Sequence, residues 1–185
     1  MECRRRFLGG YRSFGVGLVL VLVSVSSVQA AAAPADPPAM RAALGGRAIS
    51  LGDVSRFHCH DLASPLIRCF ETPAERDVDE AAMAVAMLAD RPGALGTTGS
   101  TYPYVRWYLD ANYGGPSFDA SVAYADLGTI GWNDKISSFL TYSGGHPRWW
   151  RDVGFAGVSW DWGVGVSVSY VGDAANDQFS SVERL

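Results

Sequence analysis

The stretch WYLDANYGG at residues 107–115 decides the fold, because a matching stretch, WWRDVGFAG, follows at residues 149–157. In both stretches an aromatic residue stands seven positions before a Gly. A second pair of matching blocks follows, with NDKISSF at 133–139 and NDQFSSV at 176–182. From the Gly to the last Ser is 23 positions in one copy and 24 in the other. Paired blocks at matched spacing indicate an internal repeat of 42–43 residues.

The sequence around these blocks is typical of β-structure. Short aromatic and β-branched runs, such as 104–108 and 164–171, alternate with Gly-rich turns, and helical periodicity is absent. An aromatic residue seven positions before a Gly can lie across a hairpin whose turn needs an unusual φ. This pattern predicts a compact all-β unit over residues 102–185.

The repeated blocks resemble the Greek-key motif of the βγ-crystallin family. That motif is an aromatic, six residues and a Gly, with a later Asn/Asp-Asn/Asp-x-x-Ser/Thr-Ser. The resemblance implies a β-sandwich of two intercalated four-stranded Greek keys. It also implies structural roles for the motif residues Tyr108, Gly115, Ser138, Trp150, Gly157 and Ser181.

The same resemblance implies two Ca²⁺ sites at one end of the sandwich. One site would use Asp134, the Lys135 carbonyl, the Ser137 hydroxyl and a carbonyl near Val153. The other would use Asp177, the Gln178 carbonyl, the Ser180 hydroxyl and a carbonyl near Ala111. Carboxylate, hydroxyl and carbonyl oxygens are the ligands that Ca²⁺ prefers. Lys135 departs from the pattern by adding a cation, and the alternative is a sandwich whose ion sites have decayed.

The first 30 residues have the pattern of a secretory signal peptide. Basic residues precede an apolar run over 14–25, and small residues follow at 28–30. A run of 12 residues is too short for a membrane anchor, which needs about 20. Removing residues 1–30 leaves 11 basic and 18 acidic residues, a formal charge of −7. We therefore expect a secreted protein whose acidic surface disfavours nucleic acid and anionic membranes as partners.

Two further segments are expected before the β unit. Residues 31–44 contain several prolines and predict a flexible leader. Residues 45–96 predict a small segment with one helix, which begins with a capping box at 72–75. Its apolar residues recur at helical spacing over 78–88 and predict a packing surface. RPG at 91–93 should stop the helix, and GTTGS at 96–100 reads as a linker.

Cleavage of the signal would leave two cysteines, Cys59 and Cys69. Two cysteines in an oxidising compartment usually pair, so a disulfide is predicted. The alternative is a metal site formed by HCH at 58–60 with Asp61. Adjacent residues converge on one ion with difficulty, which disfavours this alternative.

Three classes of function fit these features. The first is a secreted calcium-binding protein with a structural or stress-related role. The second is an inhibitor of an extracellular protease, because GWND at 131–134 with Trp107 and Tyr108 is similar to secreted bacterial metalloproteinase inhibitors of the crystallin-like fold. The third is a toxin-like or cell-surface binding module that uses exposed tryptophans, namely Trp149, Trp150, Trp160 and Trp162. Core packing is the simpler expectation for these tryptophans.

Catalysis is not expected from the sequence. It contains no Gly-x-Ser-x-Gly elbow, no His-Glu-x-x-His and no phosphate-binding loop. His146 lies in the link between the two repeats without a sequence partner that would indicate a triad. The sequence therefore predicts a non-catalytic protein, and the resemblance implies Ca²⁺ as its cofactor.

Overall fold

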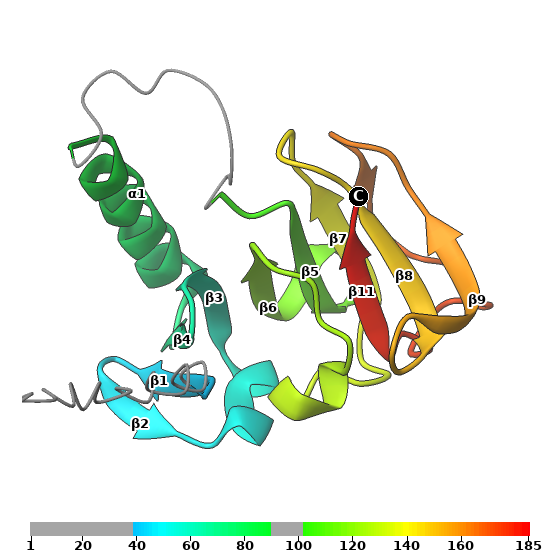
Figure 1. Ribbon diagram of the computed structural model, residues 1–185, viewed down its shortest axis with the longest axis horizontal. Helices are drawn as coiled ribbons and strands as arrows, with labels where there is room; N and C mark the ends of the chain where they lie inside the picture. Colours follow the sequence, from blue (N-terminus) through cyan, green and yellow to red (C-terminus); the bar gives the residue numbers. More distant parts are fainter. Residues whose placement is uncertain (1–38, 90–101) are drawn as a thin grey trace, which may run out of the picture. The chain divides into compact units, whose positions relative to one another are not determined.

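A computed structural model describes residues 39–89 and 102–185 of the chain. The predicted signal peptide, most of the predicted leader, the helix stop at 91–93 and the linker at 96–100 lie outside these residues. The strands are β1 (Arg41–Leu44), β2 (Arg47–Ile49), β3 (His58–Ala63), β4 (Leu66–Phe70), β5 (Val105–Asp110), β6 (Gly114–Ala120), β7 (Ser138–Thr141), β8 (Pro147–Asp152), β9 (Ala156–Asp161), β10 (Ser167–Val168) and β11 (Ser181–Arg184) (Figure 1). The helices are α1 (Pro73–Ala89) and three short 3-10 turns, η1 (Leu51–Arg56), η2 (Ala111–Tyr113) and η3 (Leu127–Ile130).

The two sequence repeats form two sheets that exchange strands. One sheet has the order β10-β7-β5-β6-β3-β4-β1-β2, and the other has the order β11-β8-β9. β10 follows the second repeat's hairpin in the chain, yet it pairs with β7 of the first repeat. Conversely, Tyr124 of the first repeat bridges Val182 in β11. This exchange confirms the predicted sandwich of two intercalated motifs.

Equivalent aromatic residues of the two repeats meet in the core. Trp107 of β5 and Trp149 of β8 contact each other edge to face, with ring centroids 5.6 Å apart. Trp107 stacks on Phe118 and Trp149 stacks on Phe179, both at 4.8 Å. All four residues are fully buried. Such pairs stabilise a fold by about 0.5–1.5 kcal/mol each beyond their burial.

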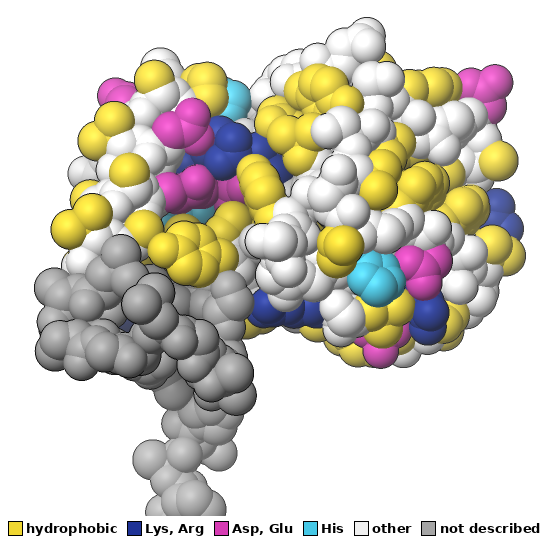
Figure 2. All heavy atoms as spheres, turned by 90° about the horizontal axis from the view of Figure 1, so that it is seen from above, with side chains coloured by type: hydrophobic (Ala, Val, Ile, Leu, Met, Phe, Trp, Pro, Cys, Tyr) yellow, Lys and Arg dark blue, Asp and Glu magenta, His cyan; other side chains and the backbone are white. Residues whose placement is uncertain are grey.

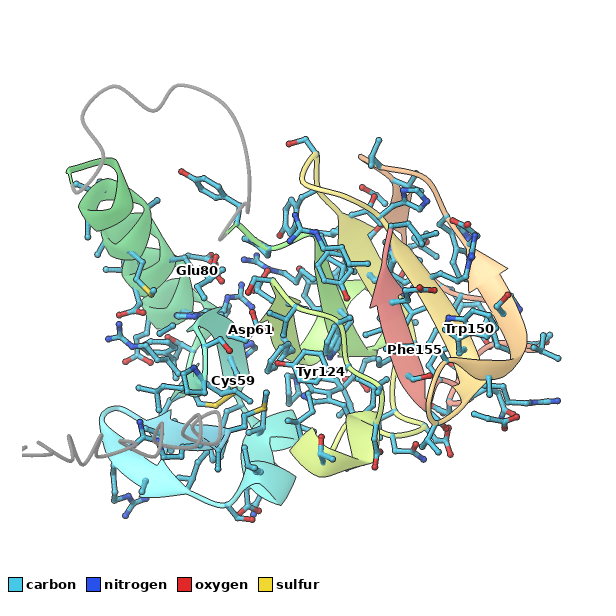
Figure 3. The ribbon with its side chains drawn as sticks, in the orientation of Figure 1. Cys59, Asp61, Glu80, Tyr124, Trp150 and Phe155 are labelled. Carbon is cyan, nitrogen blue, oxygen red and sulfur yellow. A yellow bond between two sulfur atoms is a disulfide. The ribbon has the colours of Figure 1, made fainter. Side chains whose placement is uncertain are left out.

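The other tryptophans considered for a stacking surface also support core packing. Trp160 and Trp162 are half-buried and pack against the hydrophobic core. Both contact the ring of Phe179, at centroid distances of 5.4 and 6.4 Å. Trp150 is half-buried in β8 (Figure 3).

The segment before residue 90 contains more structure than the predicted helix. Its four strands extend the first sheet, because β3 pairs in parallel with β6 in the register His58↔Ser117. β1 pairs with both β2 and β4, so the prediction of a flexible leader is wrong for residues 41–44. Parallel partners far apart in sequence leave no local pattern, which explains why these strands were not predicted.

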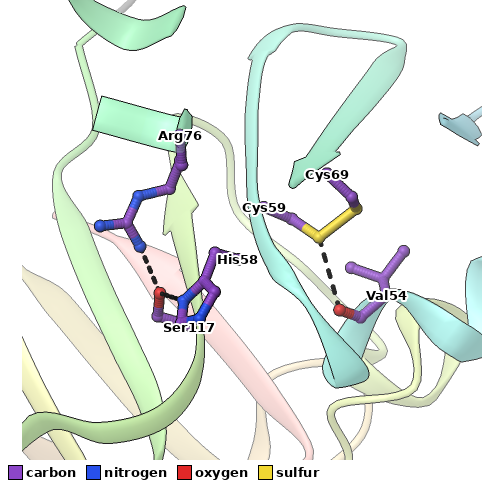
Figure 4. Close-up of a disulfide and its surroundings, with 6 residues drawn as sticks. All are labelled: Val54, His58, Cys59, Cys69, Arg76 and Ser117. Carbon is purple, nitrogen blue, oxygen red and sulfur yellow. Dashed lines mark hydrogen bonds between the residues drawn. A yellow bond between two sulfur atoms is a disulfide. The ribbon is translucent and has the colours of Figure 1, made fainter. Parts of the chain in front are cut away.

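The predicted disulfide is confirmed. Cys59 and Cys69 face each other across the antiparallel pair β3–β4 and are joined by an S–S bond. Both residues are buried, and Cys59 Sγ lies 3.4 Å from the Val54 carbonyl oxygen (Figure 4). This is a packing contact, because a disulfide sulfur carries no proton to donate. The bond also removes the thiolate that the alternative metal site required.

α1 begins as the sequence predicts. The Thr72 hydroxyl accepts a hydrogen bond from the Glu75 N–H at 3.3 Å, and the Glu75 carboxylate accepts one from the Thr72 N–H at 3.1 Å. These reciprocal bonds are the capping box, which satisfies N–H groups that have no partner within the helix. Within the described part of the chain, no helix is long and apolar enough to cross a membrane.

The buried face of α1 differs from the prediction. Val78 and Val85, which belong to the expected packing stripe, are 71% and 67% exposed. Arg76, which lies on another face, is 1% exposed instead. Its guanidinium reaches Asp119 in β6 at 3.3 Å, and Arg106 in β5 binds the same carboxylate at 2.7 Å. Paired charges compensate for the loss of hydration, so the polar face can be the one that packs.

Candidate calcium-binding loops

The two Asn-Asp runs form equivalent turns. Asp134 and Asp177 both lie in the left-handed region, with φ of 54° and 55°, which Asp tolerates better than most residues. In the first turn Asn133 Nδ2 donates to Asp134 Oδ2 at 2.7 Å, and in the second Asn176 Nδ2 donates to Asp177 Oδ2 at 2.9 Å. The first residue of each run therefore orients the carboxylate of the second.

The two turns are joined to each other rather than folded separately. The Asp134 N–H donates to the Phe179 carbonyl at 3.0 Å, and the Asp177 N–H donates to the Ile136 carbonyl at 3.5 Å. The Ser180 hydroxyl donates to Asp134 Oδ1 at 3.4 Å. The sequence grouped Ser180 with Asp177, whereas the structure brings it to the aspartate of the other repeat.

The last serine of each run ties a hairpin together. The Ser138 hydroxyl donates to the Asp110 carbonyl at 2.6 Å and accepts from the Tyr113 N–H at 3.0 Å. Ser181 makes the equivalent bonds in the second hairpin, donating to the Asp152 carbonyl at 2.7 Å and accepting from the Phe155 N–H at 3.0 Å. Both serines are fully buried, and both bonds of each hydroxyl stay within the protein.

The hairpin glycines occupy positions where a side chain would collide. Gly115 and Gly157 have φ of 71° and 78°, and the Asp110 carboxylate lies against the place where a Cβ of Gly115 would project. Tyr108 and Trp150, the aromatic residues of the motif, are half-buried in β5 and β8. The aromatic–Gly spacing therefore corresponds to a closed hairpin in each repeat.

The remaining predicted ligands lie near these turns. The Lys135 ammonium donates to the Gly131 carbonyl at 2.7 Å and to Ser55 in η1 at 3.1 Å, so this cation is held by its own partners. Gln178 donates to the Asp177 carbonyl at 3.0 Å. The residues predicted to offer cross-repeat carbonyls are Ala111, in η2, and Val153, in the turn between β8 and β9.

The oxygen atoms of the two turns fit a hard cation. Asp134 and Asp177 are exposed carboxylates, while Ser137 and Ser180 are each 8% exposed. Asn176 Oδ1 is buried and has no hydrogen-bond partner, which is uncommon in native proteins. Among residues 39–89 and 102–185, no three His, Cys, Asp or Glu side chains gather as a metal site. The chemistry on offer is therefore a mixture of carboxylate, hydroxyl and amide oxygens, as Ca²⁺ prefers.

A group of linked charges beside α1, of which Asp77 is exposed and the others are buried or partly buried, was not predicted. It comprises Arg76, Asp77 and Glu80 of the helix, with Arg106 and Asp119 of the neighbouring strands. The sequence offers one signal, the charged run at 75–80 on a helix that also has an apolar face. A charged helical face is usually solvated, so this signal does not identify the partners.

The chain is similar to solved βγ-crystallin structures. An archaeal βγ-crystallin is 32% identical, covering 45% of this chain and 99% of its own, with a TM-score of 0.41. A βγ-crystallin from Ciona intestinalis is 26% identical, covering 44% and 98%, with a TM-score of 0.41. A domain from Clostridium beijerinckii is 29% identical, covering 44% and 95%, with a TM-score of 0.40. No family model matches the chain, and no curated protein matches it significantly.

Proposed function

Because the chain belongs to the βγ-crystallin family, we propose that its two Asn-Asp turns bind Ca²⁺ in a secreted, non-catalytic protein with a structural role. The contact that supports this proposal best is the 3.4 Å approach of the Ser180 hydroxyl to Asp134 Oδ1. It gathers oxygens from both repeats at one point. The backbone of Asp177 is likewise joined to the first repeat, because its N–H donates to the Ile136 carbonyl.

Each proposed site takes its groups from both repeats. Asp134 and Ser180 would hold one ion, and Asp177 with Ser137 would hold the other by the internal symmetry. Bound Ca²⁺ supplies positive charge that compensates the carboxylate of each turn. An ion that binds only the folded state adds about 2.7 kcal/mol to stability at 100 times its Kd. Extracellular modules commonly have a Kd of about 10⁻⁴–10⁻³ M, so millimolar Ca²⁺ is the relevant range.

Calorimetric titration with Ca²⁺ after chelator treatment tests this proposal. We expect saturable binding and a higher melting temperature, both abolished in the double variant Asp134→Asn and Asp177→Asn. Asp173→Asn is the matched control, because Asp173 carries the same charge in the same loop and is held by the Tyr170 hydroxyl instead. Absence of any heat or melting shift in the parent protein would show that the turns bind no calcium.

The pairing of repeats can be tested separately. If Ser180 serves the site of Asp134, then Ser180→Ala should weaken the binding event that Asp134→Asn removes. The event lost in Asp177→Asn should remain. If Ser180→Ala weakens only the binding event that Asp177→Asn removes, then Ser180 and Asp177 bind the same ion. That result would refute sites formed by residues of both repeats.

Export is part of the same proposal. The basic start, the short apolar run and the small residues before Ala31 support a cleaved signal, and the Cys59–Cys69 disulfide suits an oxidising compartment. N-terminal sequencing of the protein recovered outside the cell should begin at Ala31. Recovery only in the cytoplasm with Met1 retained would contradict export.

A further inference from the structure

The first Asn-Asp turn contains the only lysine of the chain, Lys135, directly after Asp134. The equivalent residue of the second turn is the uncharged Gln178. Basic side chains elsewhere in the molecule bind carboxylates, as Arg148 binds Asp161 at 3.0 Å, and Figure 2 shows basic and acidic side chains side by side on one face. An ammonium bound to Asp134 in this way would compensate the negative charge that the first proposed site offers to Ca²⁺.

The Lys135 ammonium binds other partners in the structure. It donates to the Gly131 carbonyl at 2.7 Å and to the Ser55 hydroxyl at 3.1 Å. Gly131 caps the C-terminal end of η3, where a lysine can favourably bind the last carbonyls. Both partners are uncharged oxygen atoms, so these two hydrogen bonds leave the Asp134 carboxylate open to another cation.

The segment before the sandwich brings Ser55 to this lysine. Ser55 lies in η1, 80 positions before Lys135 in the chain, and it is only 5% exposed. Its neighbour Val54 is fully buried in the hydrophobic core. The Gly52 carbonyl of η1 also occupies the place where a Cβ of Gly131 would project. η1 therefore packs closely against the end of η3 and holds the Ser55 hydroxyl in a fixed position.

The Asp134 carboxylate is the competing partner for this ammonium. Lys135 is itself exposed, and its charge stands at the end of a flexible four-carbon chain with three N–H donors. The Gly131 carbonyl accepts from this ammonium, and Ser55 adds a second acceptor from another part of the chain. Loss of the Ser55 hydroxyl would leave a single bond to a neutral carbonyl, and a charged hydrogen bond to Asp134 is stronger than a neutral one. The ammonium would then move toward Asp134.

We propose that Ser55 is a positioning residue for the first ion site, because it holds the Lys135 ammonium away from the Asp134 carboxylate. This inference rests on the proposed binding of Ca²⁺ by the two turns. Through Ser55, the segment before the sandwich increases the Ca²⁺ affinity of the first turn. The second turn, which has Gln178 at the equivalent position, does not depend on that segment. Because such coupling is reciprocal, Ca²⁺ bound at Asp134 also stabilises the contact between η1 and the sandwich.

Calorimetric titration with Ca²⁺ at low ionic strength tests this role on protein purified from cells that express the full chain. Asp177→Asn isolates the first site, and in this background Ser55→Ala should lower the Ca²⁺ affinity about two- to fivefold, the range expected for an exposed ion pair. Lys135→Gln gives the first turn the residue of the second, so adding Ser55→Ala to it should change nothing. Asp134→Asn isolates the second site, whose affinity Ser55→Ala should also leave unchanged.

Two further measurements separate positioning from a loss of structure. Ser50→Ala is the matched control, because the Ser50 hydroxyl caps η1 by accepting from the Gly52 N–H at 3.2 Å and does not bind Lys135. It should leave the affinity of the first site intact. Urea unfolding in chelator needs no calcium, and there Ser55→Ala should lower the midpoint more in the parent protein than in Lys135→Gln, because only the parent loses the hydrogen bond.

The outcomes distinguish this inference from the proposed function. If the parent protein binds Ca²⁺ and Ser55→Ala leaves the affinity of the first site unchanged, the positioning role is refuted while the proposed function stands. An equal loss of affinity in Lys135→Gln, at the second site or in Ser50→Ala would also overturn it, as would additive effects of Ser55→Ala and Lys135→Gln in chelator. Absence of any Ca²⁺ binding by the parent protein would refute the proposed function and this inference together.

Discussion

Raising the pH from 7 to 9 should destabilise the protein through Glu80. The pKa of this carboxyl group is about 8 in the folded protein and 4.5 in its ordinary state, so the folded state binds a proton that the unfolded state lacks. Stability from this group is fully present below pH 4.5 and is lost as the pH rises through 8. At pH 7 the contribution is about 1.4 kcal/mol, and at pH 9 it is close to zero.

The window from pH 7 to 9 isolates this effect. Burial lowers the pKa values of His58 and His60 from 6.5, so both histidines are largely neutral above pH 7 in either state. Burial combined with the Asp119 charge raises the pKa of Tyr142 above its ordinary value of 10, so this hydroxyl does not titrate in the window. The change expected between pH 7 and 9 is therefore a loss of about 1.4 kcal/mol in the free energy of unfolding.

Urea unfolding followed by tryptophan fluorescence measures this change, because Trp107, Trp132 and Trp149 are fully buried. The midpoint should fall with pH in the parent protein and in Glu71→Gln. In Glu80→Gln, which cannot titrate, it should stay nearly constant. A midpoint that rises with pH, or an equal fall in Glu80→Gln, would refute the assignment of the proton to Glu80.

Three further perturbations have magnitudes set by the contacts described. Ser138→Ala and Ser181→Ala each leave a part-buried N–H and carbonyl without their hydroxyl partner, and urea unfolding should show a loss of about 1–3 kcal/mol in both. Asp61 accepts hydrogen bonds from two backbone N–H groups and from the Tyr124 hydroxyl (Figure 3). Asp61→Ala should therefore lower the free energy of unfolding by about 3–5 kcal/mol in the same assay. A loss below about 1 kcal/mol would show that water replaces the carboxylate. Replacing Cys59 and Cys69 together by Ala should lower stability by about 2–3 kcal/mol, the cost expected for a loop of this length, in a calorimetric melt.

The sandwich could be predicted from the sequence because its information is local and repeated. The aromatic–Gly blocks set the two hairpins, and the following Ser138 and Ser181 bind the backbone of those same hairpins. Each block is short enough to be recognised without knowledge of its partner. The exchange of strands between repeats is visible only in the structure, although the family resemblance implied it.

The segment before residue 90 could be predicted only in part. The capping box at Thr72 and the Cys59–Cys69 pair follow from local chemistry, whereas the side of α1 that packs depends on distant residues. The apolar spacing predicted that the face of Val78 would be buried. Arg76 is buried instead, because its ion pair with Asp119, which Arg106 also binds, compensates for the loss of hydration. The contact between Ser180 and Asp134 was missed for the same reason, since it joins residues 46 positions apart.

The parallel pairing of β3 with β6 also constrains the order in which the chain can fold. A polypeptide emerges from the ribosome with its N-terminal residues first. The second edge of β3 therefore has no partner until β6, residues 114–120, has been synthesised. The ion pair between Arg76 and Asp119 also requires β6. Contacts that span so much sequence slow folding, because the intervening chain has to be closed first. The four N-terminal strands therefore join the sandwich sheet only after β6 has been synthesised.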